Sequence, residues 1–120
     1  MTTSALKATA FYKEVAKNRV IWTCRDAKGF PAPFNSDGLR AMPFWSSLSR
    51  VQNSIVSSIA YESFEPIEIS WETFVEKWAV GLARDGLLVG VNWSGENSSG
   101  YDLKPAELVA NVEYYLQKST

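Results

Sequence analysis

Apolar residues return every three or four positions in four segments of the chain, which is the periodicity of an amphipathic helix. The four stripes are Leu6, Phe11 and Val15; Leu48, Val51, Ile55 and Ile59; Trp71, Phe74, Val75, Trp78 and Leu82; and Leu108, Val109, Val112 and Leu116. Mostly polar or small residues stand between them, so we expect each helix to bury one face against a core.

The third helix has the best-defined ends. Ser70 stands where an N-cap residue is needed, and Ile69 and Phe74 have the spacing of a hydrophobic staple. Gly86 follows the last turn, where a glycine ends a helix by adopting a left-handed conformation. These signals predict a helix that begins after Ser70 and ends before Gly86.

Four runs between the helices have the composition of β-strands: residues 20–24, 39–45, 64–69 and 87–93. The run 64–69 alternates apolar and acidic residues and is expected to be half-buried. The run 87–93 is apolar on both faces, which is typical of a central strand. Pro43 cannot donate a ladder hydrogen bond, so we expect the run 39–45 at the edge of a sheet.

The resulting order is α-β-β-α-β-α-β-α, with a hairpin-like pair of strands near the start. This order predicts an α+β fold in which a sheet of about four strands is packed by about four helices. The segment Ser94–Gly100 has the composition of a flexible loop. A chain of 120 residues is expected to form a single domain, residues 1–120.

Composition excludes several classes of function. The chain contains no histidine, which rules out His-dependent catalytic triads and dyads and His-based zinc sites. With 12 basic and 13 acidic side chains the net charge is -1, so we predict no general nucleic-acid binding. Lys7 and Lys13 interrupt the first segment, and no stretch reaches the roughly 18 apolar residues of a membrane span. We therefore expect a cytoplasmic protein with no membrane contact and no cofactor.

The chain has one thiol, Cys24, beside Arg25. A neighbouring arginine lowers the pKa of a thiol when the two groups meet. Adjacent residues of a strand face opposite ways, however, so Cys24 is expected to share its face with Val20 and Trp22. We predict a buried, unreactive thiol, and a lone cysteine cannot form an internal disulfide.

Two further patterns share features with functional sites. Glu62, Glu65 and Glu68 resemble the carboxylates of acid–base or hard-cation sites, but a spacing of three on an extended segment scatters them between faces. We expect a solvated strand edge there. The segment Gly95–Gly100 is bounded by glycines as anion-binding loops are, yet it lacks a lysine and contains Glu96. No catalytic residue and no metal site is predicted.

Tryptophans supply the remaining candidate site. Trp22, Trp45 and Trp93 lie at strand positions near loops, with Arg40 and Phe44 close in sequence. Exposed tryptophan and arginine anchor protein interfaces, so these five residues are the predicted binding face. The alternative is that the three indoles simply cover the sheet, because tryptophan is often largely buried.

One ordered set of motifs resembles a known family. It comprises Leu39-x-x-Met42-Pro43-Phe44-Trp45-Ser46-Ser47, Glu65-Pro66-Ile67-Glu68-Ile69-Ser70 with Phe74, then Trp78, Gly81, Leu82, Asp85-Gly86 and Val91-Asn92-Trp93. This order resembles the bacterial family described as domain of unknown function 2750, from about residue 20 to 116. It is more remotely similar to SseB-like domains, which share a segment that caps a helix and a strand that ends in Asn. The resemblance implies a fold, and it implies no activity and no functional residues.

Three hypotheses about function follow. The first is a non-enzymatic interaction module that presents an aromatic surface around Trp45 to a protein partner or to its own copy, as a two-fold homodimer. The second is a small-molecule-binding or hydrolytic domain that uses carboxylates and arginines; its general base would need an Asp, Glu or Lys with a perturbed pKa. The third is an immunity-type inhibitor protein, for which the net charge of -1 is mild.

Overall fold

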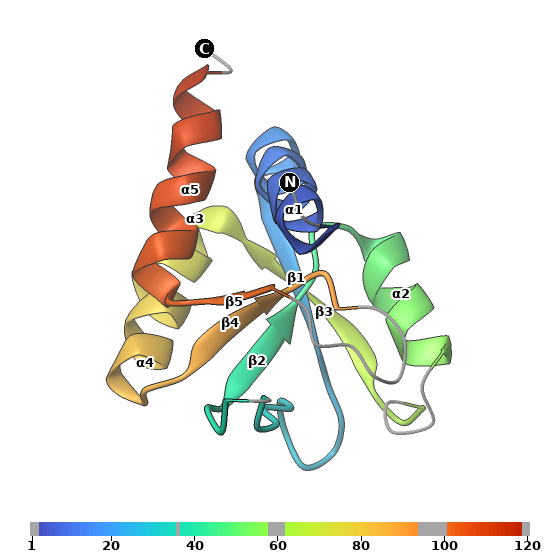
Figure 1. Cartoon of the computed structure of the whole chain (residues 1–120). Coiled ribbons are helices and arrows are strands. Elements are labelled where there is room, and N and C mark those ends of the chain that lie inside the picture. The colour runs from blue at the N-terminus through green and yellow to red at the C-terminus, as the bar shows by residue number, and fades with distance from the viewer. Residues whose placement is uncertain (1–2, 36, 58–61, 94–100, 119–120) are drawn as a thin grey trace.

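A computed structural model describes residues 3–35, 37–57, 62–93 and 101–118. The elements in chain order are α1 (Thr3–Asn18), β1 (Val20–Arg25), β2 (Ala41–Phe44), α2 (Leu48–Val56), β3 (Glu65–Ser70), α3 (Trp71–Thr73), η2 (Phe74–Trp78), α4 (Ala79–Arg84), β4 (Leu88–Val91), β5 (Tyr101–Leu103) and α5 (Pro105–Lys118) (Figure 1). This composition of elements confirms the predicted α+β class.

The strands form two sheets. β1 and β3 pair antiparallel from Val20 opposite Ser70 to Arg25 opposite Glu65. The second sheet has the order β2-β4-β5, in which β2 and β4 are parallel and β5 is antiparallel to β4. An isolated antiparallel bridge between Trp22 and Trp45 links the two sheets.

Proline explains why that link is so short. The Trp22 and Trp45 backbones exchange hydrogen bonds of 2.8 and 2.7 Å. Pro43 has no N–H and cannot extend this ladder. Its carbonyl instead accepts a 2.9 Å hydrogen bond from the buried Thr23 hydroxyl. β1 and β2 therefore stay in contact without forming one continuous sheet.

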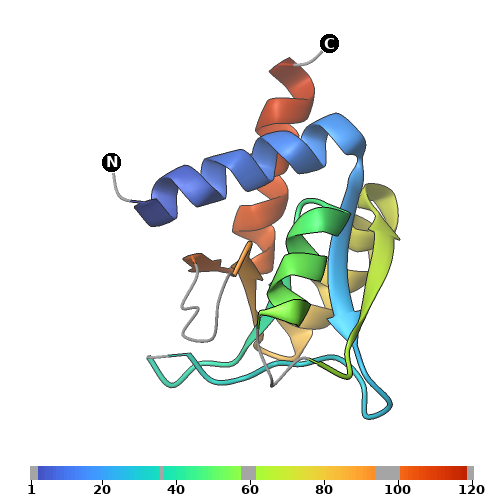
Figure 2. The ribbon, with the colours of Figure 1, turned by 90° about the vertical axis from the view of Figure 1, so that its right-hand side faces the viewer.

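The helices cover the sheets on different sides. α1 and α5 pack against each other and against β4, while α2 packs against β1 and β3 (Figures 1 and 2). Figure 2 shows α1 crossing α5. The main core lies beneath this pair and includes Phe11, Phe44, Phe74, Val89 and Leu108, each fully buried.

The third predicted helix has the expected ends and an unexpected middle. The Ser70 hydroxyl accepts a hydrogen bond from the backbone N–H of Thr73, and Gly86 adopts a φ of 70°. Between α3 and α4 the backbone winds more loosely, as the π-helical segment η2. π-Helical insertions are rare and often accompany functional sites. Here the segment contains Trp78, whose ring lies edge to face with the Phe30 ring at a centroid distance of 4.9 Å.

Three details differ from the sequence predictions. The first two strands do not form a hairpin, because each finds a partner later in the chain. The strands lie in two sheets, and β5 was missed since three residues are too short to show a periodicity. The helix predicted to reach Ile59 ends at Val56 among the described residues. Ile59 itself and the predicted loop Ser94–Gly100 lie outside them.

In the described part of the chain, no helix combines the length and apolar character needed to cross a membrane.

Candidate functional site

The predicted tryptophan face lies largely inside the molecule. Phe44, Trp45 and Trp93 are 0%, 2% and 6% exposed, Trp22 is half-buried, and Arg40 is exposed. Trp45 and Trp93 share a small core cluster with Cys24, Ala41 and Val51. The expectation of an exposed aromatic surface centred on Trp45 is therefore wrong. A binding role of these five residues stays a prediction, and only Arg40 and part of Trp22 are accessible to a partner.

Hydrogen bonds explain how two indoles can be buried. Trp45 Nε1 donates to the Trp93 carbonyl at 2.8 Å and to Ser54 Oγ at 3.0 Å, and Ser54 Oγ donates to the same carbonyl at 2.7 Å. Trp93 Nε1 donates to Asp102 Oδ1 at 3.0 Å. Buried indole N–H groups need such partners. These contacts join α2, β5 and the ends of β2 and β4, so the two tryptophans act as structural anchors.

A polar cluster lies just beyond the carboxyl ends of the parallel strands β2 and β4. The Ser46 N–H donates to Asn92 Oδ1 at 3.0 Å, and Asn92 Nδ2 donates to Ser46 Oγ at 3.1 Å. Ser46 Oγ also donates to Glu14 Oε1 at 2.7 Å, and Arg50 holds the Glu14 carboxylate with two hydrogen bonds. In open α/β sheets this end of parallel strands is the usual place for ligands.

The geometry of this cluster favours a structural role. Asn92 has a φ of 49°, a conformation that asparagine tolerates better than most residues. Ser46 is fully buried and Asn92 is nearly so, which leaves a substrate no approach to either. Among the described residues, every buried side-chain nitrogen or oxygen has a hydrogen-bond partner. The cluster ties α1 and α2 to the ends of both strands.

Cys24 is buried at 0% exposure, which confirms the predicted burial of the thiol. Burial, with a smaller contribution from the charge of Asp26, raises the pKa of the thiol to about 12. A thiol with such a pKa is almost entirely protonated at neutral pH and is a poor nucleophile.

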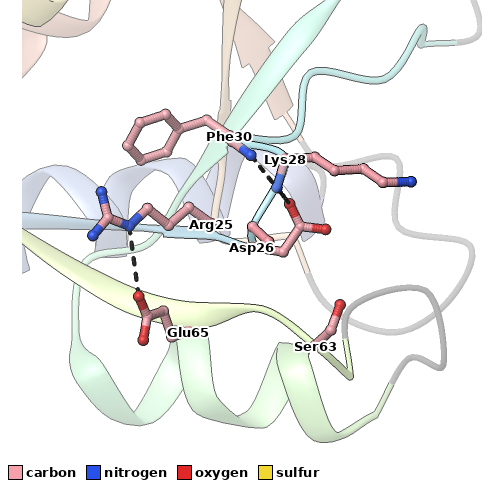
Figure 3. Close-up of a pocket in the computed structure, with 8 residues that line it drawn as sticks. Arg25, Asp26, Lys28, Phe30, Ser63 and Glu65 are labelled. Carbon is pink, nitrogen blue, oxygen red and sulfur yellow. Dashed lines mark hydrogen bonds and ion pairs between the residues drawn. The ribbon is translucent and has the colours of Figure 1, made fainter.

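An open polar depression of about 600 Å³ lies where β1 ends at Arg25 and β3 begins at Glu65 (Figure 3). Arg25 and Glu65 point toward each other across it and form an ion pair of 3.5 Å. Asp26 Oδ1 accepts hydrogen bonds from the backbone N–H groups of Lys28 and Gly29, which fixes the turn after β1. These charges are satisfied by their neighbours, and the ion pair is more than half exposed, so water screens it.

The acidic residues singled out from the sequence follow the solvated interpretation. Glu62, Glu65 and Glu68 are all exposed. No group of three or more Cys, Asp or Glu residues within the described ranges is placed to hold one metal ion. A second, apolar depression of about 260 Å³ lies between β2 and the helix that contains Trp78, with Lys77 and Asp85 among its lining residues.

The most distinctive surface lies between the first and last helices. Four of the chain's five tyrosines line a depression of about 270 Å³, which we call the tyrosine groove: Tyr12, Tyr101, Tyr114 and Tyr115, with Ala8, Thr9 and Asn111. α1 and α5 supply all of these residues except Tyr101, which begins β5. Tyr101 and Tyr114 are 41% and 51% exposed. Large aromatic groups are therefore open to solvent here.

Three of the four tyrosine rings of the groove are held by contacts with neighbouring side chains. Tyr12 and Tyr115 stack at a centroid distance of 6.4 Å, and Tyr114 meets Tyr115 edge to face at 5.1 Å. Lys13 and Lys118 lie over the rings of Tyr115 and Tyr114 at 5.9 and 4.8 Å. Such cation–π contacts stabilise the ring positions. The groove is preorganised rather than assembled from mobile side chains.

The seven residues that line the groove include no acidic or basic side chain, and the charges of Lys13 and Lys118 lie over two of its rings. Burial raises the pKa of Tyr12 above its ordinary value of 10.0, against a hydrogen bond with the Asn111 side chain that lowers it. The Tyr12 phenol is therefore protonated and neutral under physiological conditions. Ring faces, hydroxyl groups and one amide are the chemical groups that the groove offers to a ligand.

Sequence reasoning missed this site. Tyr12 and Tyr115 are separated by most of the chain, and only the packing of α1 on α5 brings them together. A partial signal is present in the last helix, where Asn111, Tyr114 and Tyr115 stand beside the core-facing stripe. Tyr114 lies on the exposed side of the helix and Tyr115 at the margin of its buried stripe, and such a pair indicates an aromatic surface.

The family assignment follows from a model described as "Protein of unknown function (DUF2750)", which matches residues 8–112. The chain belongs to this family. The matched residues include the Ser46–Asn92 cluster and the groove from Ala8 to Asn111, whereas Tyr114 and Tyr115 lie beyond them. No curated protein matches the chain.

Proposed function

We propose that the chain is a non-enzymatic protein-interaction domain that binds a partner segment in the tyrosine groove. The observation that carries the proposal is the gathering of four tyrosines, two of them 41% and 51% exposed, around one depression. Tyrosine is enriched among the residues that contribute most to interface energies. We thus retain the hypothesis of an interaction domain, but the aromatic surface that we propose for binding lies on α1 and α5 and not around the tryptophans.

Rigidity also supports this site. Tyr12, Tyr114 and Tyr115 contact one another through their rings, and two lysine side chains lie over Tyr114 and Tyr115, so these three rings have little freedom left to lose on binding. Ordering of side chains is one of the main costs of association. An inhibitor of the immunity type would be a special case of the same function, because it too would bind a protein.

The small-molecule hypothesis has weaker support. The depression beside Arg25 has a volume of about 600 Å³, within the range of ligand sites. Three of its charged groups, however, already have partners: Arg25 and Glu65 form an ion pair, and the Asp26 carboxylate holds the turn after β1. A cytoplasmic location and the remote similarity to SseB-like domains stay predictions.

Selection of peptides tests the proposal. A displayed library of random peptides is panned against the wild-type chain and against a Tyr101→Ala/Tyr114→Ala variant. We expect peptides that bind the wild type and lose binding to the variant. Phe34→Ala is the matched control, since Phe34 is 73% exposed and does not line the groove. Peptides that bind all three proteins equally would contradict the proposal.

A further inference from the structure

The size of the tyrosine groove restricts what it can bind. Its volume of about 270 Å³ is slightly below the roughly 300–1,000 Å³ of most small-molecule sites. The depression is also too open to enclose a cofactor. One or two side-chain rings of an extended chain, laid across the helices, would fit.

The chemistry of the lining excludes several modes of peptide recognition. Clusters of arginine recognise phosphorylated or acidic peptides, and the groove lining contains no arginine; the nearby Lys13 and Lys118 lie over the rings of Tyr115 and Tyr114 instead. Amphipathic helices bind in long aliphatic grooves, which a short aromatic depression does not provide. Added strands need a free edge, and the edge strand here, β5, spans only Tyr101–Leu103.

Recognition of a polyproline II helix fits the same lining. This conformation has no internal hydrogen bonds, so its carbonyl groups are free to accept them. Tyr12 and Asn111 place a hydroxyl and an amide within the groove; they hydrogen-bond to each other, and the amide has a second N–H. Proline rings pack against aromatic faces, and Tyr101 and Tyr114 offer partly exposed ones. A ligand already fixed in this conformation loses little entropy when it binds.

We infer that the segment bound in the tyrosine groove is a proline-rich stretch of another protein in the polyproline II conformation, an inference that rests on the proposed function. Tyr114 contributes an exposed ring that the prolines contact, and Asn111 contributes a donor to a carbonyl between them.

Titration of the ¹⁵N-labelled chain with an acetylated, amidated decamer of proline tests this inference. We expect amide shifts confined to α1, α5 and β5, and an affinity weakened at least about tenfold by Tyr114→Ala. Tyr114 is half exposed, so this variant is expected to fold, which its spectrum will verify. Phe34→Ala serves as the control variant and a glycine–serine decamer as the control peptide. The first is expected to leave the affinity unchanged and the second not to bind.

Several outcomes would overturn the inference. They are the absence of shifts at millimolar peptide, shifts outside the groove, and an affinity that Tyr114→Ala leaves unchanged. A wild-type chain that sediments as an oligomer and becomes monomeric with Tyr114→Ala would show that the occupant is a second copy. If groove-dependent library peptides lack proline, this inference fails while the proposed function stands. If no groove-dependent peptide is found, both fail.

Discussion

Ser46 and Asn92 hold each other by reciprocal hydrogen bonds at the ends of two parallel strands. The Ser46 N–H donates to Asn92 Oδ1, and Asn92 Nδ2 donates to Ser46 Oγ, at 3.0 and 3.1 Å. The two residues are 46 positions apart in the chain. Both belong to motifs on which the family resemblance rests, and their hydrogen bonds give a physical reason why the two motifs occur together. They fix the junction from which α2 departs.

Replacing Asn92 tests how much this junction stabilises the fold. Asn92→Ala removes the hydrogen bonds to Ser46 and leaves an alanine at a φ of 49°. We expect a loss of about 2–4 kcal/mol in the free energy of unfolding, measured by urea denaturation. Asn92→Gly tolerates the backbone conformation and should cost less. A loss below about 0.5 kcal/mol for the alanine variant would contradict the structural role.

Glu14 is expected to make stability depend on pH. A hydrogen bond from Arg50, with a smaller one from Ser46, holds the pKa of Glu14 below its ordinary value of 4.5. The folded state therefore binds this proton less readily than the unfolded state. The stabilisation is present above about pH 4.5 and is lost as the pH falls through the folded pKa.

The measurement compares urea denaturation at pH 6 and pH 3. The wild type should lose more stability over this interval than Glu14→Gln, which cannot titrate at this position. Arg50→Gln should also reduce the dependence, because Arg50 supplies the main cause of the shift. A Glu14→Gln variant that retains the full wild-type dependence would refute this assignment.

Local signals account for the parts of the fold that the sequence predicted well. The ends of the third helix depend on Ser70 and Gly86, each of which acts within its own turn. The central place of β4 follows from apolar residues on both faces of the run 87–93. Such features need no knowledge of distant segments, so they can be read from a single sequence.

The burial of Trp45 depends on contacts that no local pattern contains. β2 is an outer strand of its own sheet, as Pro43 indicated, and the sequence does not show which segment covers its large apolar side chains. Val51 of α2, together with Cys24 of β1 and Trp93, packs around the indole. The tyrosine groove has the same origin, since Tyr12 and Tyr115 meet only through the packing of two terminal helices.

Cys24 should be unreactive in the native protein. A fully buried thiol with a pKa of about 12 has almost no thiolate at pH 8. Its modification by a chromogenic disulfide reagent is expected only through unfolding of the chain. In denaturant the same thiol should react within the mixing time. Rapid modification of the folded protein would show that Cys24 is accessible.

Replacement by alanine is expected to have opposite effects on stability at Gly90 and Gly81. A Cβ at Gly90 would overlap the ring of Trp93, so Gly90→Ala should destabilise the protein by about 1–3 kcal/mol. A Cβ at Gly81, in α4, would meet nothing closer than 3.7 Å. Gly81→Ala should stabilise the protein by up to about 1 kcal/mol, because alanine favours a helix. Equal thermal midpoints for the two variants would contradict the packing of Trp93 on Gly90.

Trp45→Ala distinguishes a structural anchor from an interface residue. The indole is 2% exposed, and its Nε1 donates to Ser54 and to the Trp93 carbonyl. Removing it creates a cavity and should cost about 3–5 kcal/mol in the free energy of unfolding. Trp45→Phe retains much of the packing and should cost less. Both effects should be the same at low and high protein concentration, because they arise within one chain. A Trp45→Ala variant that keeps wild-type stability as a monomer, yet no longer forms an oligomer that the wild type forms, would return Trp45 to an interface.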